Sequence, residues 1–510
     1  QERTRCHKEY KIFMALWLKD IRKARMIEIV NETTPLYSKS VVDLESASST
    51  ASDESGSTSS SCCHDATDAR QHVASIRMFG SVSLLVNELV GPGILDIPAT
   101  FQRNGLIPTT IVIVVIALLS AKISLSMAKV ISMMPGNTNF SKEVEYSQSF
   151  QHFLGTHASV VTQLVFFTAM MSQMIASIVE TAQVVDAFFG NFAHSVGLQF
   201  YPSPKFVFWG NEDCDIEADA SSCEPFADAT KTGDNELILT LGYLACAAMF
   251  IPIGRMSLEG NMFFQELSYV ITLLCCAQFA YAFYSEGLEF PQNMPLWADN
   301  VNWQDLIGVV LFNYAIVTAV PSWLYEKATD VKAESAVAQS CLISSIMYVI
   351  VGSLGALSIP NVPPNVLSVL SSGNMGPMSS LFASMFTFFI VGLGIPLFSV
   401  LMRLNLVGSG FCSERVGQHL TTTLPWAISW FLYQGEFVQI LMSWGGILMS
   451  LIVFVAPLYL ACYVTFSSNV SKDALDPSIV DRKTTSMEQV ELILLSAVSA
   501  IVITVALFCQ

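Results

Sequence analysis

The residues best placed to do chemistry in this 510-residue chain lie in one stretch, 86–105. Glu88 is a carboxylate in an otherwise apolar run, and three residues later come Gly91, Pro92 and Gly93. Pro92 has no amide hydrogen and its ring crowds the preceding turn, so this triplet predicts a break in a helix. In lipid, the backbone groups freed by a break must find partners in protein, water or a ligand. The stretch is therefore predicted to be a binding site.

The composition of the chain indicates a membrane protein. Hydrophobic residues make up 52% of the sequence and charged residues 13%, whereas soluble domains carry about 25% charged residues. Many apolar runs reach the roughly 20 residues that a helix needs to cross a bilayer. The formal net charge of −17 argues against a nucleic-acid partner, which would require a basic surface. We expect an integral multi-pass protein in contact with the lipid bilayer.

The apolar runs predict roughly eleven transmembrane helices. The predicted spans are 78–103, 106–134, 157–189, 236–254, 260–284, 303–325, 337–359, 378–403, 418–433, 437–464 and 488–509. Residues 1–76 precede them and are rich in Ser, Thr and Asp over much of their length. Such a composition buries too little apolar surface to fold, so we expect a largely disordered tail.

The distribution of Lys and Arg predicts that the N-terminus is cytoplasmic. With the tail inside, eleven basic residues of the connecting segments fall on the cytoplasmic side and three on the other side. The loop 190–235 then lies outside the cytosol. Its Cys214 and Cys223 form either a disulfide, in an oxidising compartment, or two free thiols. The plasma membrane and the membrane of a vacuole-like organelle both remain open.

The sixth predicted span carries a second candidate break. Asn313, Tyr314 and Thr318 are polar residues in its apolar run, and Pro321, with a hydroxyl one turn earlier, is predicted to mark the discontinuity. An ordinary proline kink is the alternative interpretation. The spacing favours a break, because the two interruptions lie five spans apart and five spans form one half of an inverted-repeat transporter. Corresponding interruptions in the two halves point to a binding site near the middle of the membrane.

This spacing predicts three parts beyond the tail. Residues 77–285 form the first repeat, residues 303–464 form the second, and residues 488–509 add a C-terminal span. Each repeat would contribute one broken helix to a site between them.

Two motifs resemble the amino acid/auxin permease family, within the amino acid–polyamine–organocation transporters. They are NELVGPGILDIPATFQRNGLIP at 87–108 and FNYAIVTAVPSW at 312–323. The resemblance implies an all-α membrane protein with a LeuT-like 5+5 inverted repeat in which spans one and six are broken. It also implies secondary-active transport of amino acids by alternating access, as in a symporter.

The chain departs from the family pattern in two places. Many members have Gly-Gly-His or a similar segment where Ala315, Ile316 and Val317 stand here, which leaves the substrate open. The eighth span reads FIVGLGIPLFSV and offers fewer hydroxyls than sodium-coupled members have. We therefore expect a co-transported proton rather than sodium.

A zwitterionic amino acid needs partners for its carboxylate and its ammonium group. The half-helix after the first break directs free N–H groups and a positive dipole end at the site, so the backbone of Gly93, Ile94 and Leu95 suits the carboxylate. Gly91, Gly93 and the carbonyls around Pro92 are predicted to face the ammonium group, helped by carbonyls at 314–318, from Tyr314 to Thr318. The alternative is that these glycines only allow close helix packing.

Three polar side chains are candidates for ion coupling. Burial favours the protonated form of a carboxyl, so Glu88 would take and release a proton in each cycle, or else hold a static hydrogen bond. Asn87 stands at a family position that contributes a cation-ligating or bridging amide. Glu180 is a second buried carboxylate. Asp96 and Arg103 are either gating charges or an interfacial pair.

Other functions remain open at this stage. One alternative is a transporter whose solute is a polyamine, a peptide-like compound or an auxin-like acid. Another is an amino acid sensor without turnover. An enzyme is not expected, because no histidine stands at the middle of a span to serve a nucleophile–base pair. The cysteines form no cluster with histidine, so no metal or cofactor is expected either.

Overall fold

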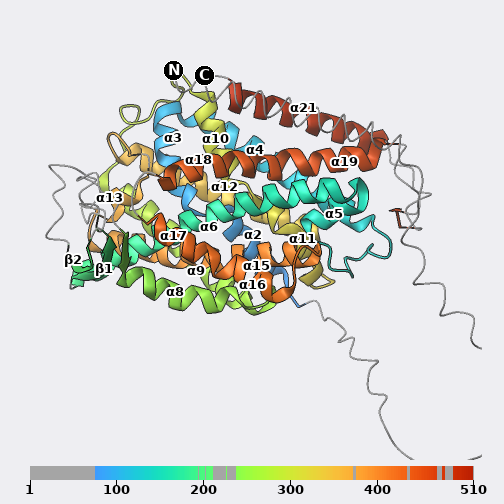
Figure 1. Cartoon of the computed structure of the whole chain (residues 1–510). Helices are drawn as coiled ribbons and strands as arrows, with labels where there is room; N and C mark the ends of the chain where they lie inside the picture. Colours follow the sequence, from blue (N-terminus) through green and yellow to red (C-terminus); the bar gives the residue numbers. More distant parts are fainter. Residues whose placement is uncertain are drawn as a thin grey trace, which may run out of the picture. The chain divides into compact units, whose positions relative to one another are not determined.

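The computed structural model describes residues 75–192, 194–201, 203–210, 226, 237–363, 365–371, 375–433, 437–467, 474–476 and 486–508. The predicted tail 1–76 falls almost entirely outside the described residues, as do Cys214 and Cys223. The described part of residues 72–510 is a bundle of helices with one small sheet at an end (Figure 1).

The long apolar helices of the bundle follow the predicted spans closely. In chain order the helices are α2 (Met78–Leu89), η1 (Pro92–Leu95), α3 (Ile97–Asn104), α4 (Leu106–Ser132), α5 (Tyr146–Leu154), α6 (Thr156–Phe192), α8 (Leu241–Gly254), α9 (Leu258–Glu286), α10 (Trp303–Asn313), η4 (Ile316–Thr318), α11 (Val320–Glu326), α12 (Ala333–Ser358), α13 (Leu367–Ser371), α14 (Pro377–Met385), η5 (Phe386–Val391), α15 (Gly392–Gly408), α16 (Glu414–Thr422), α17 (Leu424–Phe431), α18 (Phe437–Ser450), η6 (Leu451–Val455), α19 (Ala456–Phe466) and α21 (Ser486–Phe508).

Eight spans in the described residues are long and apolar enough to cross a membrane, and the bent pair α2 and α3 adds a ninth. Two further predicted spans are shorter than expected. The prediction for 236–254 was wrong at its start, because Leu237–Thr240 forms a strand and only α8 is helical. The span predicted at 418–433 divides at Thr423 into α16 and α17, because Pro425 stands in the first turn of α17.

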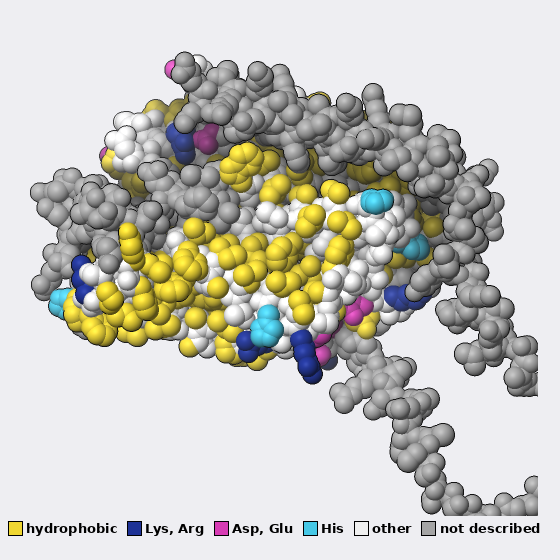
Figure 2. Space-filling view, in the orientation of Figure 1, with side chains coloured by type: hydrophobic (Ala, Val, Ile, Leu, Met, Phe, Trp, Pro, Cys, Tyr) yellow, Lys and Arg dark blue, Asp and Glu magenta, His cyan; other side chains and the backbone are white. Residues whose placement is uncertain are grey.

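Apolar side chains cover the outer sides of the bundle as well as its core. Large hydrophobic residues are exposed on α4, α9 and α12, for example Leu118 at 61%, Phe263 at 68% and Leu342 at 62%. Figure 2 shows hydrophobic side chains spread over the middle of one face, with charged side chains toward its edges. A contiguous apolar exterior of this kind is the surface that lipid solvates.

The region predicted only as a loop, 190–235, contains part of a three-stranded antiparallel sheet. Its strands are β1 (Ser195–Tyr201), β2 (Lys205–Trp209) and β3 (Leu237–Thr240), in the order β2-β1-β3. Figure 1 shows β1 and β2 at one end of the bundle, beyond α6.

The side chain of Asp186, near the end of α6, fastens this sheet to the bundle. Its carboxylate is fully buried and accepts four hydrogen bonds. The donors are the hydroxyls of Ser195 at 2.6 Å, Thr240 at 2.5 Å and Tyr433 at 2.6 Å, and the backbone N–H of Gly242 at 2.8 Å. Four donors compensate for the water that the buried carboxylate has lost.

We expect Asp186→Ala to destabilise the protein strongly. The change leaves four buried donors without their acceptor, and each unsatisfied group costs about 1–3 kcal/mol. The melting temperature in detergent should fall by several degrees, whereas it should hardly change for Asp299→Ala, because Asp299 is exposed. Equal melting temperatures for the two variants would contradict a role of Asp186 in holding the sheet.

Candidate functional site

The first span breaks where the sequence predicts. Helix α2 ends at Leu89, η1 begins at Pro92, and the two halves of the span are bent by 59°. Pro92 occupies the first turn of η1, where the missing N–H would have had no partner in the helix. The chain reaches Pro92 through Gly91, which has an extended backbone. The prediction of a break at this triplet is confirmed.

The second break lies earlier in the sixth span than predicted. Helix α10 ends at Asn313 and η4 begins at Ile316, so the chain leaves the helical path at Tyr314 and Ala315. The prediction that Pro321 marks the discontinuity was wrong. Pro321 lies in the first turn of α11, a position at which its ring fits a helix.

Side chains from unbroken helices satisfy carbonyls at both breaks. The hydroxyl of Tyr348 on α12 donates to the carbonyl of Leu89. The hydroxyl of Ser120 on α4 donates to the carbonyl of Tyr314 over 2.8 Å. Because these partners sit on continuous helices, the two breaks are fixed features of the fold.

A cavity opens between the two breaks. Its walls come from α2, the first break, α6, α10, α15 and α18. The lining residues are Asn87, Glu88, Leu89, Gly91, Pro92, Gln173, Ser177, Phe312, Asn313, Ala315, Phe398 and Met449. None of these described residues is basic. The cavity thus combines one carboxyl, several amides and an apolar wall.

Glu88 faces this cavity and reaches across to the second break. Its Oε1 lies 2.6 Å from the hydroxyl oxygen of Thr318. That same hydroxyl lies 2.7 Å from the carbonyl oxygen of Ala315. The other carboxyl oxygen, Oε2, is buried and has no hydrogen-bond partner among the described residues. The contact between Glu88 and Thr318 therefore joins the two broken spans directly.

Asn87 joins the first span to two further helices. Its Nδ2 donates to the backbone carbonyl of Gln265 on α9 over 2.8 Å and to the side-chain oxygen of Gln265 over 2.9 Å. The Nε2 of Gln265 in turn donates to the carbonyl of Leu393 on α15 over 3.3 Å. The Oδ1 of Asn87 is buried and has no partner within the described residues. One free acceptor of Asn87 is thus left at the cavity.

The two glycines of the first break have different surroundings. A methyl group built on Gly91 would meet no atom within 4 Å, whereas one on Gly93 would lie 1.8 Å from Oδ1 of Asn313. Gly91 therefore borders open space, and Gly93 allows α10 to approach closely. Ile94 and Leu95 are buried and, like Gly93, are absent from the cavity wall. The carbonyl of Leu95 accepts from the backbone N–H of Val366 over 3.0 Å.

Tyr314 and Glu180 also lie away from the cavity wall. The side chain of Tyr314 is fully buried, and its hydroxyl pairs with Ser345 over 2.8 Å. Glu180 lies on α6, one turn beyond Ser177, which does line the cavity. Sequence reasoning missed Gln173 and Ser177. Their spacing of four residues, continued by Glu180 three residues later, places all three on one helix face and could have revealed them.

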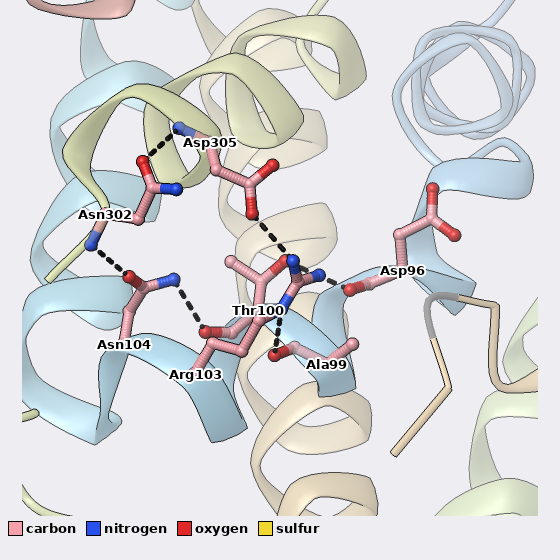
Figure 3. A network of polar contacts seen from close by, with 7 residues as sticks. All are labelled: Asp96, Ala99, Thr100, Arg103, Asn104, Asn302 and Asp305. Atoms are coloured by element: carbon pink, nitrogen blue, oxygen red, sulfur yellow. Dashed lines mark hydrogen bonds and ion pairs between the residues drawn. The ribbon is translucent and has the colours of Figure 1, made fainter. Parts of the chain in front are cut away.

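The charges near the far end of the first span pair across to α10. Arg103 donates to the carboxylate of Asp305 over 2.9 Å and to the carbonyl of Ala99 over 3.2 Å (Figure 3). The carboxylate of Asp96 points away from Arg103 in the same view. The ion pair of Arg103 is therefore with Asp305 and not with Asp96, and the alternative that the two residues are gating charges stays a prediction. Arg103 ties α3, in the second half of the first span, to α10, the first half of the sixth span.

Comparisons with known proteins agree with this architecture. Residues 74–209 match the model of a family described as transmembrane amino acid transporter protein. The chain also superposes on the crystal structure of MhsT in complex with L-phenylalanine, with a TM-score of 0.57 and 12% sequence identity, over 86% of this chain and 100% of that one. No curated protein sequence matches the chain.

The structural match supports the LeuT-like fold that the resemblance implies. The sequence match covers the first break and the residues that flank it. Residues 74–209 of the chain are therefore similar to the transmembrane amino acid transporter family, and the chain shares its fold with a solved transporter.

Proposed function

We propose that this protein carries an amino acid across the membrane together with a proton, and that the proton binds Glu88. The contact of Glu88 with Thr318 carries the proposal. A hydroxyl has a single hydrogen to donate, and the carbonyl of Ala315 can only accept. Both short contacts of Thr318 are satisfied at once when Thr318 donates to Ala315 and a protonated Glu88 donates to Thr318.

The charge balance of the cavity supports the same protonation state. An ionised carboxylate inside a membrane is costly unless a cation or several donors compensate for it. The cavity wall offers no basic residue in the described part of the chain, and Oε2 of Glu88 has no donor there. Loss of the proton would leave Thr318 to be shared between two acceptors. Deprotonation would therefore weaken the link between the broken spans, as a coupled conformational cycle requires.

The cavity wall suits a neutral amino acid. Asn87, Gln173 and Asn313 offer amide groups for the polar ends of the substrate, and Phe312, Phe398 and Met449 offer an apolar surface for its side chain. A solved protein of the same fold holds L-phenylalanine. The proposed substrates are therefore neutral amino acids with an apolar portion, moved by alternating access between the two sides of the membrane.

Uptake of labelled amino acids into proteoliposomes tests this function. We expect uptake to increase when the outside is acidic and to be indifferent to sodium. A sensor without turnover would bind the amino acid but give no exchange against internal unlabelled substrate. A transporter of polyamines or auxin-like acids would fail to accumulate any member of an amino acid panel.

Glu88→Gln should abolish the stimulation of uptake by acid. Glutamine keeps the shape of the protonated carboxyl and can still donate to Thr318, but it cannot exchange a proton. Accumulation driven by a pH gradient should fall to the level without a gradient, while exchange of internal for external substrate continues. The measurement is uptake at several external pH values in matched proteoliposomes.

Glu286→Gln is the matched control, because Glu286 is an exposed glutamate at the end of α9. It should behave as the unmodified protein. Full stimulation by acid in Glu88→Gln would rule out Glu88 as the coupling residue.

The two glycines of the first break should respond differently to alanine. Gly91→Ala adds a methyl group to open space at the cavity, so the protein should fold normally but transport several-fold more slowly. Gly93→Ala forces a methyl group against Asn313, and overpacking of this kind costs about 1–3 kcal/mol. Its melting temperature in detergent should fall by several degrees.

Measuring both the transport rate and the melting temperature of each variant separates the two effects. If Gly91→Ala transports normally at an unchanged melting temperature, then the cavity is not on the path of the substrate.

A further inference from the structure

A second carboxyl without a basic partner lies outside the membrane-spanning helices. Glu145 stands at the N-terminus of α5 and is 2% exposed. Its carboxyl group caps α5 by accepting from the backbone N–H of Gln148. Its Oε2 accepts from the hydroxyl of Ser322 on α11 over 2.7 Å. Glu145 therefore connects α5 to the second half of the broken sixth span.

The end of α15 also packs against the side chain of Glu145. A methyl group built on Gly408, the last residue of α15, would lie 2.9 Å from Cγ of Glu145. The neighbouring residue Ser147 contacts the side chains of Asn405 on α15 and Gln163 on α6. Glu145 thus sits where α5, α6, α11 and α15 meet.

Helix α11 is held at this end by polar contacts besides that with Glu145. The indole N–H of Trp323 donates to the hydroxyl of Ser81 on α2 over 3.0 Å. The N–H of Ile76 donates to the carbonyl of Glu326 over 3.1 Å, and the N–H of Ala328 donates back to Ile76 over 2.9 Å. These hydrogen bonds hold α11 to α2 and to the residues that precede it. Glu145 holds α11 to α5.

The charged groups that act on Glu145 are both acidic. Glu143, two residues earlier, and Glu326, at the end of α11, repel its carboxylate. The groups presented by α6 and α15 at this junction, Gln163, Asn405 and Ser409, carry no charge. Helix α19 (Ala456–Phe466) contains no charged residue.

The cations near this junction are turned elsewhere. Nζ of Lys327 donates to the carbonyl of Val331 over 3.0 Å and lies over the ring of Phe140. Arg403 on α15 donates to the carbonyl of Gly254 and pairs with Glu414. Both cations thus have partners other than this carboxyl, and Oε1 of Glu145 is buried without a hydrogen-bond partner in the described residues.

We propose that Glu145 is a second proton-binding site, which holds α11 against α5 and α15 when protonated and releases α11 when ionised. On release, the O–H bond of the carboxyl breaks, the proton passes to water on that side of the membrane, and the remaining carboxylate becomes hydrated. Repulsion between the carboxylates of Glu145 and Glu326 then favours separation of α11 from α5. This site rests on the proposed alternating-access function but does not depend on the role of Glu88.

The pH range in which Glu145 controls the release of α11, which we call the proton latch, lies between the pKa values of Glu145 in the closed and the open arrangement. Burial, followed by repulsion from Glu143 and Glu326, raises the pKa of Glu145 to about 8 in the closed arrangement. A hydrated glutamate has a pKa of about 4.3. Because the closed state binds the proton more tightly, a rise in pH between these values favours opening, by about tenfold per pH unit. Below and above this window the opening equilibrium is independent of this group.

Hydrogen exchange of the amides of α11 tests the proposal in the full-length protein in lipid nanodiscs. Exchange of peptides that cover Val320–Glu326 is measured from about pH 5 to about pH 9.5, corrected for the chemical exchange rate, and referred to peptides of α12 in the same sample. In the unmodified protein, the corrected rate should rise with pH, by up to about tenfold per unit. Glu145→Gln should stay closed with a flat profile.

One check of the variant and two further variants make the test specific. Glu145→Gln keeps a side-chain oxygen that can cap α5, and the melting temperature of this variant shows whether it is folded. Glu143→Gln, at an exposed position, should keep the slope. Ser322→Ala removes a hydrogen bond that lowers the pKa of Glu145, so the upper end of its profile should move to higher pH.

A pH-dependent profile retained in folded Glu145→Gln would overturn the proposal, and so would a flat profile in the unmodified protein. Glu88→Gln separates this site from the proposed function. It should lose acid-stimulated uptake and keep the pH profile of α11. If instead uptake in Glu88→Gln stays acid-stimulated while Glu145→Gln flattens the profile, the proton latch stands and the role of Glu88 falls.

Discussion

The requirement that backbone polar groups be paired away from water governs this structure. Two helices stop within the apolar bundle, and each leaves carbonyls that the helix no longer satisfies. Tyr348 supplies a hydroxyl at the first break, and Ser120 supplies one at the second. Both come from unbroken helices, so the bundle itself keeps the breaks open. A cavity with polar groups therefore exists in a protein whose other spans are largely apolar.

The halves of the two broken spans are paired with each other at both ends. At one end, Arg103 on α3 bonds Asp305 on α10, and the backbone of Asn302 donates to the side chain of Asn104 (Figure 3). At the other end, Trp323 on α11 bonds Ser81 on α2. Within each span, the break separates the half that belongs to one pair from the half that belongs to the other. This arrangement suits a mechanism in which the two ends open in turn, because each pair can move as one body about the site between them.

Much of this could be predicted from the sequence, because length and apolarity are local properties. The limits of α4, α6 and α12 fall within a few residues of the predicted spans. The first break was predictable because Gly91, Pro92 and Gly93 disfavour a helix by themselves.

The remaining features depend on contacts between distant residues. The second break was misplaced at Pro321, because a proline that begins a helix and one that interrupts a helix look alike in sequence. The partner of Glu88 lies 230 residues away, and the partner of Glu145 lies 177 residues away. No local pattern gives such pairs. The same is true of the sheet, whose third strand follows a long intervening segment.

Three buried carboxyl groups in this protein show how the number of donors decides what a carboxyl can do. Asp186 accepts four hydrogen bonds, so its charge is compensated where it stands and its role is to hold the sheet. Glu88 has one hydroxyl neighbour, and Glu145 has one hydroxyl and one backbone N–H. Neither has a base beside it in the described structure, and each retains one oxygen without a partner. A carboxyl in such surroundings is stable when protonated and becomes stable as an anion only when water reaches it. Movement of a half-helix is what would admit that water, so protonation and helix movement are coupled at both sites.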